Sequence, residues 1–144
     1  RISALVIKNL FGTLSNKKLA ILGFSFKANT NDTRDSPCIN ISKEFLKEGA
    51  ELNFYDPKVG KMQILREFED IKDSKIFVFK SAFEAAQGAD AVLIITDWEE
   101  FKYLDWISIY KVMRKPAWVF DTRICLDPEK IRNIGFNIWT LGRE

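Results

Sequence analysis

The chain has 144 residues, of which 47% are hydrophobic and 29% charged, and its formal net charge is +2. These values are typical of one globular domain with a sizeable core, and they exclude the strong basic excess of many nucleic-acid-binding proteins. No apolar run reaches the roughly 18 residues of a membrane span, and the first residues lack the separate regions of a signal peptide. Without histidine, and with Cys38 and Cys125 far apart, the chain has no zinc-ligand pattern and no cysteine–histidine or serine–histidine pair. We expect a cytoplasmic protein without a metal, a nucleic-acid partner or a membrane span.

The first half of the chain alternates between predicted helices and strands. Apolar residues at helical spacing predict a helix that ends near Gly12: Ile2, Val6, Leu10 and Phe11. Residues 19–24 form an apolar run of strand length, typical of a strand buried on both faces. Ser36 as N-cap and Pro37 as first helical residue begin the next helix, which Gly49 ends.

The second half continues the alternation. A strand over 52–55 ends at Asp56-Pro57, and the lysine-rich stretch 58–75 holds a short helix near 62–68. Ser81 and Glu84 form a capping box for a helix that ends at Gly88. Further strands are predicted over 76–79, 91–96, 117–120 and 136–140, and further helices over 104–113 and from Asp127-Pro128 to Gly135. The pattern predicts a single doubly wound α/β domain with a mostly parallel, Rossmann-like sheet and helices on both faces.

Ligands of such sheets bind beyond the carboxyl ends of the strands, so the segments 24–36, 96–98 and 120–123 are candidate site segments. Lys27 and Arg34 precede a helix N-terminus, and Arg123 follows a buried strand, an arrangement suited to phosphate. Solvated surface charges are the alternative for each of these cations.

Other chemistry-bearing residues favour structural roles. Asp56 could hold a dinucleotide ribose, but the first loop has only Gly23 where a dinucleotide fold has G-x-G-x-x-G, so we prefer a simple strand terminator. Cys38 lies in a first helical turn without a base partner, and Cys125 also lacks the signature of a nucleophile. Trp98 is either a core residue or a neighbour of the ligand.

Several long motifs resemble a known family. LAILGFSFKANTNDTRDS, followed by YDPKV, is similar to the UDP-binding domain of UDP-glucose 6-dehydrogenases, where ILGFxFK leads to DTR(E/D)S and then to YDPKV. GADAVLIITDWEEFKYLDW and KPAWVFDTR are similar to two later segments of that family, which is shared with GDP-mannose dehydrogenases. The matches run in order from about Leu10 to the last strand. The motif sequences are closer to those of the animal-type enzymes than to those of the GDP-mannose branch.

The resemblance implies roles for single residues. Phe26 and Lys27 match the family's substrate-contacting Phe-Lys pair, and Arg123 matches a substrate-contacting arginine. Arg34 matches an arginine that reaches toward NAD in the interdomain cleft. Thr122 replaces the glycine of the family's FDGR element, and if that glycine has positive φ, threonine is strained there by about 1–2 kcal/mol.

The resemblance also implies what surrounds the chain. The family oxidises UDP-glucose to UDP-glucuronate with NAD, through a catalytic cysteine and an N-terminal Rossmann domain, and neither is recognisable here. We therefore expect a fragment that binds a nucleotide sugar without oxidising it: residues 1–13 end the interdomain helix and linker, and 14–144 form the UDP-sugar-binding C-terminal domain of a homo-oligomeric enzyme.

Three alternatives stay open. The parent enzyme could belong to the same family but act on another nucleotide sugar. The chain could be a stand-alone nucleotide- or CoA-binding regulatory module. It could also be a structural half in which Ile2, Val6 and Leu10 form an exposed helix face for self-association.

Overall fold

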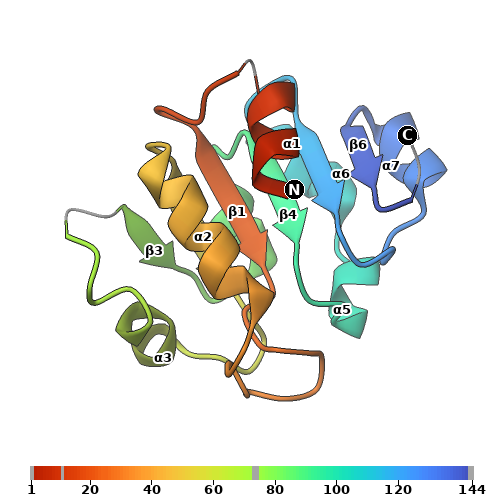
Figure 1. Cartoon of the computed structure of the whole chain (residues 1–144). Coiled ribbons are helices and arrows are strands. Elements are labelled where there is room, and N and C mark those ends of the chain that lie inside the picture. The colour runs from red at the N-terminus through yellow and green to blue at the C-terminus, as the bar shows by residue number, and fades with distance from the viewer. Residues whose placement is uncertain (1, 11, 73–74, 143–144) are drawn as a thin grey trace.

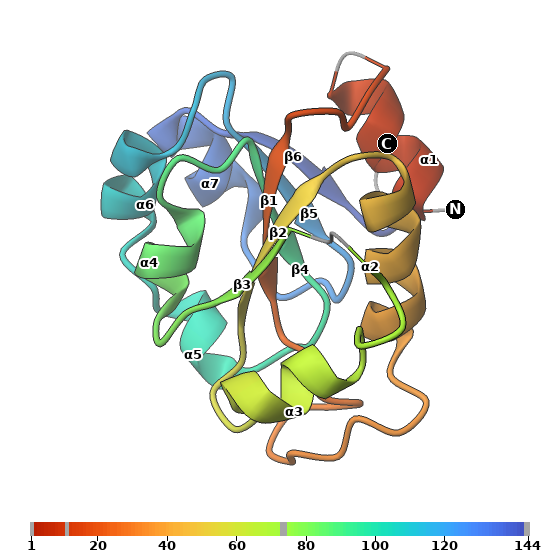
Figure 2. The ribbon, with the colours of Figure 1, turned by 90° about the vertical axis from the view of Figure 1, so that its left-hand side faces the viewer.

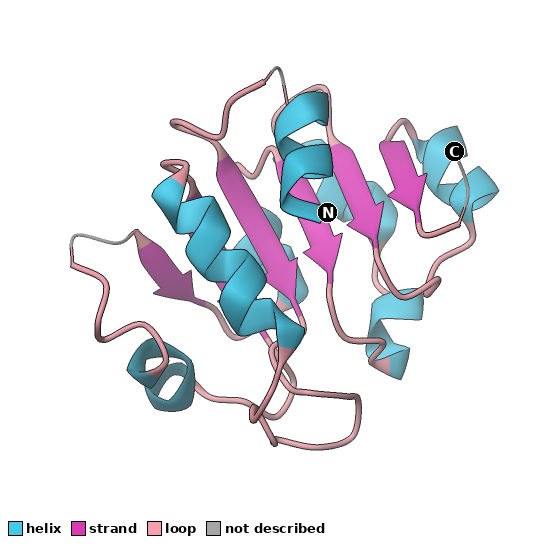
Figure 3. Ribbon diagram, in the orientation of Figure 1, coloured by secondary structure: helices cyan, strands magenta, loops and turns pink. Residues whose placement is uncertain are grey.

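The structure is a computed structural model that describes residues 2–10, 12–72 and 75–142, so the predicted helix residue Phe11 lies outside the described residues. Six strands form one parallel sheet in the order β3-β2-β1-β4-β5-β6 (Figures 1 and 3). The strands are β1 Lys18–Leu22, β2 Glu51–Tyr55, β3 Ile76–Val78, β4 Ala91–Ile94, β5 Trp118–Asp121 and β6 Asn137–Thr140. This confirms the predicted doubly wound α/β fold.

Helices cover both faces of the sheet. They are α1 Ile2–Asn9, α2 Pro37–Lys47, α3 Lys61–Arg66, α4 Ala82–Ala86, α5 Glu99–Lys102, α6 Trp106–Val112 and α7 Pro128–Ile134. Figure 2 shows α1 and α2 on one side of the sheet and α4, α5, α6 and α7 on the other. None of the described helices is long and apolar enough to cross a membrane.

The strand order explains why α1 is needed. The chain moves outward from β1 to β3 and returns to β4 before moving outward in the opposite direction, and right-handed crossovers then place the connecting helices of the two halves on opposite faces. No crossover helix therefore covers β4 and β5 on the α2 side. Helix α1 covers them (Figure 1). Val6 in α1 (0% exposed) and Leu10 directly after it (2% exposed) share a core cluster with Leu93 and Phe120.

This packing contradicts the hypothesis of an exposed helix face for self-association. Val6 and Leu10 are buried by the chain's own sheet, and Ile2 is half-buried against the same cluster. The apolar face of α1 is thus part of the domain core.

The three helix starts predicted from a cap residue agree with the structure. The side chain of Ser36 accepts a hydrogen bond from the Cys38 N–H, Ser81 accepts one from the Glu84 N–H, and Asp127 accepts one from the Glu129 N–H. These caps depend on residues two or three positions apart, so the local sequence determines them.

Several boundaries differ from the prediction by one or a few residues, and two of these differences have a clear local cause. The helix expected over 104–113 begins at Trp106, because the Asp105 carboxylate caps it by accepting the Ser108 N–H, and a separate short helix, α5, precedes it. The strand expected over 19–24 ends at Leu22, because Gly23 turns the backbone with a φ of +96°.

Gly23 brings two strand ends into close contact. A Cβ atom at this position would lie 2.5 Å from the Thr96 Cβ and 2.7 Å from the Thr96 backbone nitrogen. Thr96 is fully buried and cannot move aside cheaply. Only glycine therefore fits between the ends of β1 and β4.

We predict that Gly23→Ala lowers the free energy of unfolding by about 2–4 kcal/mol, the sum of backbone strain and overpacking. Urea unfolding followed by circular dichroism measures this loss. Gly60→Ala is the matched control, because a Cβ at Gly60 meets no atom within 4 Å and its φ is −85°. An equal loss in both variants would contradict the steric account of Gly23.

Candidate functional site

The Asp56 carboxylate organises the loops that follow β1 and β2. Its Oδ2 atom accepts hydrogen bonds from the Phe24 N–H (2.7 Å) and the Ser25 N–H (3.0 Å). Its Oδ1 atom accepts those of Lys58 (2.8 Å) and Val59 (3.0 Å). Both oxygens are therefore used by backbone groups. Asp56 is not available to bind a ribose, in agreement with the sequence analysis, which preferred a structural role for it. It does more than terminate β2, however, since it joins two loops.

The same loop is held on either side of Phe26 and Lys27. The Ser25 hydroxyl donates to the Lys27 carbonyl at 2.9 Å, and the Thr96 hydroxyl donates to the Ser25 carbonyl at 2.9 Å. The Phe26 N–H donates to the Asp32 carbonyl at 2.6 Å, while the Phe26 side chain is 47% exposed and Lys27 is exposed. A backbone held in this way presents an aromatic ring and an ammonium group to solvent.

Arg34 lies in the same loop but is engaged by a neighbour. Its guanidinium donates to both carboxylate oxygens of Asp32, from Nε at 3.0 Å and from Nη2 at 2.9 Å. This hydrogen bonding lowers the pKa of Asp32 to about 2 and raises the pKa of Arg34. The Arg34 side chain is 87% exposed, so the paired guanidinium faces solvent.

A second buried carboxylate organises the loop after β5. Asp121 is 0% exposed and accepts hydrogen bonds from the N–H groups of Arg123 (3.1 Å to Oδ1), Cys125 (2.8 Å to Oδ2) and Leu126 (2.8 Å to Oδ2). The Thr122 hydroxyl donates to the Ile94 carbonyl at 2.6 Å, which ties the loop to β4. The backbone around Arg123 is thus fixed from both sides.

The strain expected at Thr122 is absent, because its φ is not positive. The strained residue of this loop is instead Ile124, whose φ is +55° and whose side chain is 65% exposed. A β-branched residue in the left-handed region is a conformational outlier.

Arg123 reaches the end of β4. Its Nη2 atom lies 3.5 Å from an Asp97 carboxylate oxygen, and its Nη1 atom lies 3.5 Å from the Ile95 carbonyl oxygen. Trp98, considered above as a possible neighbour of the ligand, is 7% exposed and packs in the core. The segment 96–98 therefore contributes Asp97 rather than Trp98 to the exposed site.

The three segments expected to form a site do meet. The Thr96 hydroxyl contacts the loop that carries Phe26 and Lys27, and Asp97 next to it contacts Arg123. Among the described residues, however, no hydrogen bond or ion pair links Lys27 or Phe26 to Arg123, and none links Arg34 to any of the three. The site residues share one edge of the sheet without a direct contact.

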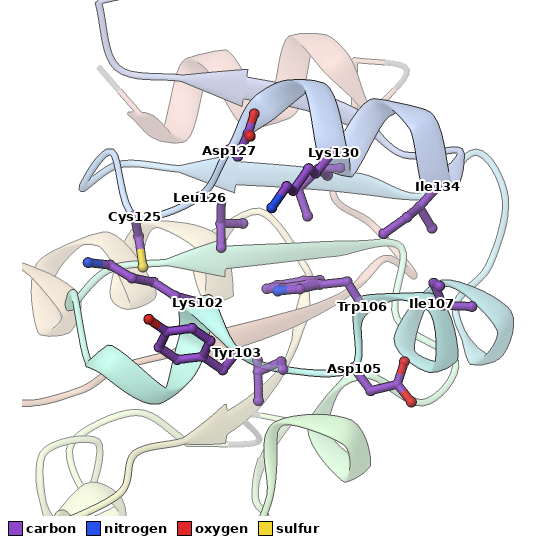
Figure 4. Close-up of a pocket in the computed structure, with 12 residues that line it drawn as sticks. Lys102, Tyr103, Asp105, Trp106, Ile107, Cys125, Leu126, Asp127, Lys130 and Ile134 are labelled. Atoms are coloured by element: carbon purple, nitrogen blue, oxygen red, sulfur yellow. The ribbon is translucent and has the colours of Figure 1, made fainter.

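A hollow of about 480 Å³ lies next to this edge, between the α5–α6 connection, the end of the β5–α7 loop and α7 (Figure 4). Figure 4 shows the Trp106 ring inside it and the side chains of Lys102, Tyr103 and Cys125 close together at one end. None of Phe26, Lys27, Arg34 or Arg123 lines it. The hollow is therefore separate from the site that the sequence motifs predict.

Comparison with known proteins identifies the family. The family model described as "UDP-glucose/GDP-mannose dehydrogenase family, UDP binding domain" matches residues 20–128. The chain belongs to this family. It is 44% identical to the UDP-glucose 6-dehydrogenase of Pongo abelii over 153 aligned residues, which include 100% of this chain and 31% of the relative. It is 40% identical to that of Drosophila melanogaster and spans 32% of its length. The resemblance predicted from the motifs is confirmed.

Solved structures of other nucleotide-sugar dehydrogenases share the fold. A UDP-D-ManNAc dehydrogenase from Pyrococcus horikoshii matches with a TM-score of 0.76 and 27% identity, over 99% of this chain and 30% of the other. An NDP-N-acetyl-D-galactosaminuronic acid dehydrogenase from Methanosarcina mazei matches with a TM-score of 0.80 and 22% identity, over 99% and 28%. The chain spans about a third of the length of these proteins.

The two cysteines have the surroundings of structural residues in this family domain. Burial raises the pKa of the Cys38 thiol to about 12, and the Cys38 Sγ atom lies 3.7 Å from the Ser42 hydroxyl oxygen. Burial, followed by the nearby charge of Asp121, raises the pKa of the Cys125 thiol to about 11. Both thiols stay protonated near neutral pH, so neither is suited to act as a nucleophile.

We predict that both thiols react slowly with Ellman's reagent in the folded chain at mildly alkaline pH, because only thiolates react and both side chains are buried. The same chain in guanidinium chloride serves as the control and should release two equivalents of product rapidly, one from each cysteine. Rapid native labelling of Cys38 would contradict the described burial.

A second prediction concerns the strained loop. Ile124→Asn should raise the free energy of unfolding by about 0.5–1 kcal/mol. The left-handed backbone conformation is less unfavourable for asparagine than for a β-branched residue. The exposed isoleucine side chain loses little packing in this change. Ile124→Val keeps the β-branch and should leave the stability unchanged, as measured by thermal unfolding of both variants.

Proposed function

We propose that the chain is the nucleotide-sugar-binding part of an NAD-dependent UDP-glucose 6-dehydrogenase, which oxidises UDP-glucose to UDP-glucuronate. The observation that carries this proposal is the 44% identity to UDP-glucose 6-dehydrogenases over the entire chain. In this proposal, residues 14–144 are the UDP-sugar-binding domain and residues 1–13 end the helix and linker that join it to the rest of the enzyme.

Phe26, Lys27 and Arg123 are the proposed substrate contacts. Both loops that carry them are held by buried carboxylates, so little conformational freedom is lost when a ligand binds. Lys27 forms no ion pair among the described residues, and the Arg123 guanidinium has long contacts of 3.5 Å that leave donors for a diphosphate. Phe26 offers an exposed ring for contact with the ligand.

The ends of β1 and β2 lack the features with which a dinucleotide-binding fold holds NAD. Gly23 is packed against Thr96 and leaves no room for a pyrophosphate beside it, and both oxygens of the Asp56 carboxylate are used by backbone N–H groups. We therefore propose that the rest of the enzyme binds NAD and that Arg34 contacts it from this side. NAD, when bound, accepts the hydride of the oxidation.

The catalytic cysteine of the proposed enzyme also lies outside this chain, since Cys38 and Cys125 are buried thiols with raised pKa values. By itself, the chain is proposed to bind without oxidising. We propose a cytoplasmic, homo-oligomeric parent enzyme; the two unpaired cysteines are consistent with a reducing compartment.

A related substrate is the second candidate. The Pyrococcus horikoshii structure, 27% identical, is a UDP-D-ManNAc dehydrogenase, so the same domain serves more than one nucleotide sugar. The higher identity to UDP-glucose 6-dehydrogenases favours UDP-glucose. A stand-alone regulatory module would bind its nucleotide tightly without a partner domain.

We predict that Lys27→Ala and Arg123→Ala each weaken UDP-glucose binding by about 1–3 kcal/mol, because each removes a charge-assisted contact to the diphosphate. Isothermal titration calorimetry on the chain measures the change. Lys111→Ala and Arg132→Ala are the matched controls, since each removes an exposed helical cation that is not a proposed contact; Arg132 is paired with Glu129 within α7.

Arg34→Ala should leave UDP-glucose binding unchanged, because Arg34 is assigned to the cofactor. Equal affinities for the wild type and both proposed contact variants would refute the assigned site. Tight binding of NAD to the chain would refute the division of ligands between the two parts of the enzyme.

A further inference from the structure

A second hollow lies at the ends of β2 and β3. Its volume is about 410 Å³, within the range of small-molecule sites. Tyr55 and Phe79 are among its lining residues, and three lysines also line it: Lys58, Lys61 and Lys80. No residue of the β1–α2 loop or the β5–α7 loop takes part, so this hollow is distinct from the proposed substrate site.

The sheet brings these lysines together. Strands β2 and β3 are parallel neighbours with Phe54 paired to Val78, and the Phe79 N–H donates to the Phe54 carbonyl at 2.9 Å. Lys80 therefore leaves the sheet beside the loop that contains Lys58. That loop is held in place, because the Asp56 carboxylate accepts the Lys58 N–H at 2.8 Å.

The charges of the three lysines are not balanced by neighbours. Among the described residues, none of the three forms an ion pair or a side-chain hydrogen bond, whereas other lysines of the domain are paired with carboxylates: Lys18 with Glu51, Lys43 with Asp70 and Lys102 with Glu99.

Fewer carboxylates than lysines line the hollow. Asp56 is the acidic residue in the lining, and its oxygens accept four backbone N–H groups. Glu100 accepts the Tyr55 hydroxyl at 2.7 Å on the adjoining helix. The concave surface therefore carries an excess of positive charge, and a concave surface of one sign concentrates counter-ions.

We propose that this hollow is a second anion site, which binds a small molecule carrying a diphosphate. Three ammonium groups around one concave surface match the negative charge of a diphosphate better than that of a monophosphate. The lining also includes the aromatic residues Tyr55 and Phe79, which a nucleoside attached to the diphosphate would contact. The site can be occupied together with the proposed substrate site, since the two share no residue.

The test is a calorimetric titration of the chain with pyrophosphate at low ionic strength. The double variant Lys58→Ala/Lys80→Ala should bind about tenfold more weakly or worse, as expected for two lost charge-assisted contacts. Lys47→Ala/Lys111→Ala removes the same charge from other exposed positions and should bind nearly as the wild type does. All four positions are exposed, so the variants should fold, which heteronuclear NMR spectra can verify.

The variant Lys27→Ala/Arg123→Ala separates this site from the proposed substrate site. This variant should lose affinity for UDP-glucose but still bind pyrophosphate in the hollow at the ends of β2 and β3. If that variant abolishes pyrophosphate binding while Lys58→Ala/Lys80→Ala does not, pyrophosphate binds at the substrate site and the inference is wrong. Equal losses in the Lys58→Ala/Lys80→Ala and Lys47→Ala/Lys111→Ala variants, or no binding by the wild type, would also overturn it.

A titration with ADP distinguishes a nucleotide from a free diphosphate as the ligand of this hollow. Tighter binding of ADP than of pyrophosphate, with the difference removed by Phe79→Ala, supports a nucleotide in the hollow. Equal binding of the two supports recognition of the diphosphate alone.

Discussion

The hydrogen bonds of the buried Asp56 carboxylate are the interaction on which the edge with the proposed site residues depends. Parallel strands end side by side, and the loops that leave them carry backbone N–H groups that the sheet no longer pairs. Asp56 accepts four of these groups, two from the loop after β1 and two from the loop after β2. A charged acceptor makes such bonds stronger than neutral ones, so one side chain fixes two loops at once.

The rest of the edge repeats this solution. Asp121 accepts the N–H groups of Arg123, Cys125 and Leu126 after β5, and Thr96 joins β4 to the loop after β1 through its hydroxyl and its contact with Gly23. As a result, the cationic side chains project from loops whose backbones are already ordered. Preorganisation of this kind lowers the conformational entropy that is lost when a ligand binds.

Local sequence patterns predicted the alternation of strands and helices along the chain, apart from the short helix α5, and most of the helix caps. Ser36, Ser81 and Asp127 were recognisable as caps because each acts on a residue two or three positions away. The packing of α1 was not predictable in the same way, since an apolar helix face looks alike whether it covers the chain's own sheet or that of a partner. Only the strand order shows that this region of the sheet lacks a crossover helix.

The site was predictable to a lesser degree. The motifs singled out Phe26, Lys27, Arg34 and Arg123, and the structure places Arg123 beside Asp97 at the end of β4. The organising role of Asp56 was not visible, because two of its partners, Phe24 and Ser25, are 32 and 31 residues away in the sequence. The strain considered for Thr122 lies at Ile124 instead, since φ values in a tight loop depend on its hydrogen bonds.

The most direct test of the proposed substrate site is a heteronuclear NMR titration of the isotopically labelled chain with UDP-glucose. The proposal predicts that the largest amide shifts fall on Phe26, Lys27 and Arg123, and that UDP alone reproduces most of them. Shifts that instead cluster around the hollow next to Trp106, or that appear with NAD but not with UDP-glucose, would contradict it.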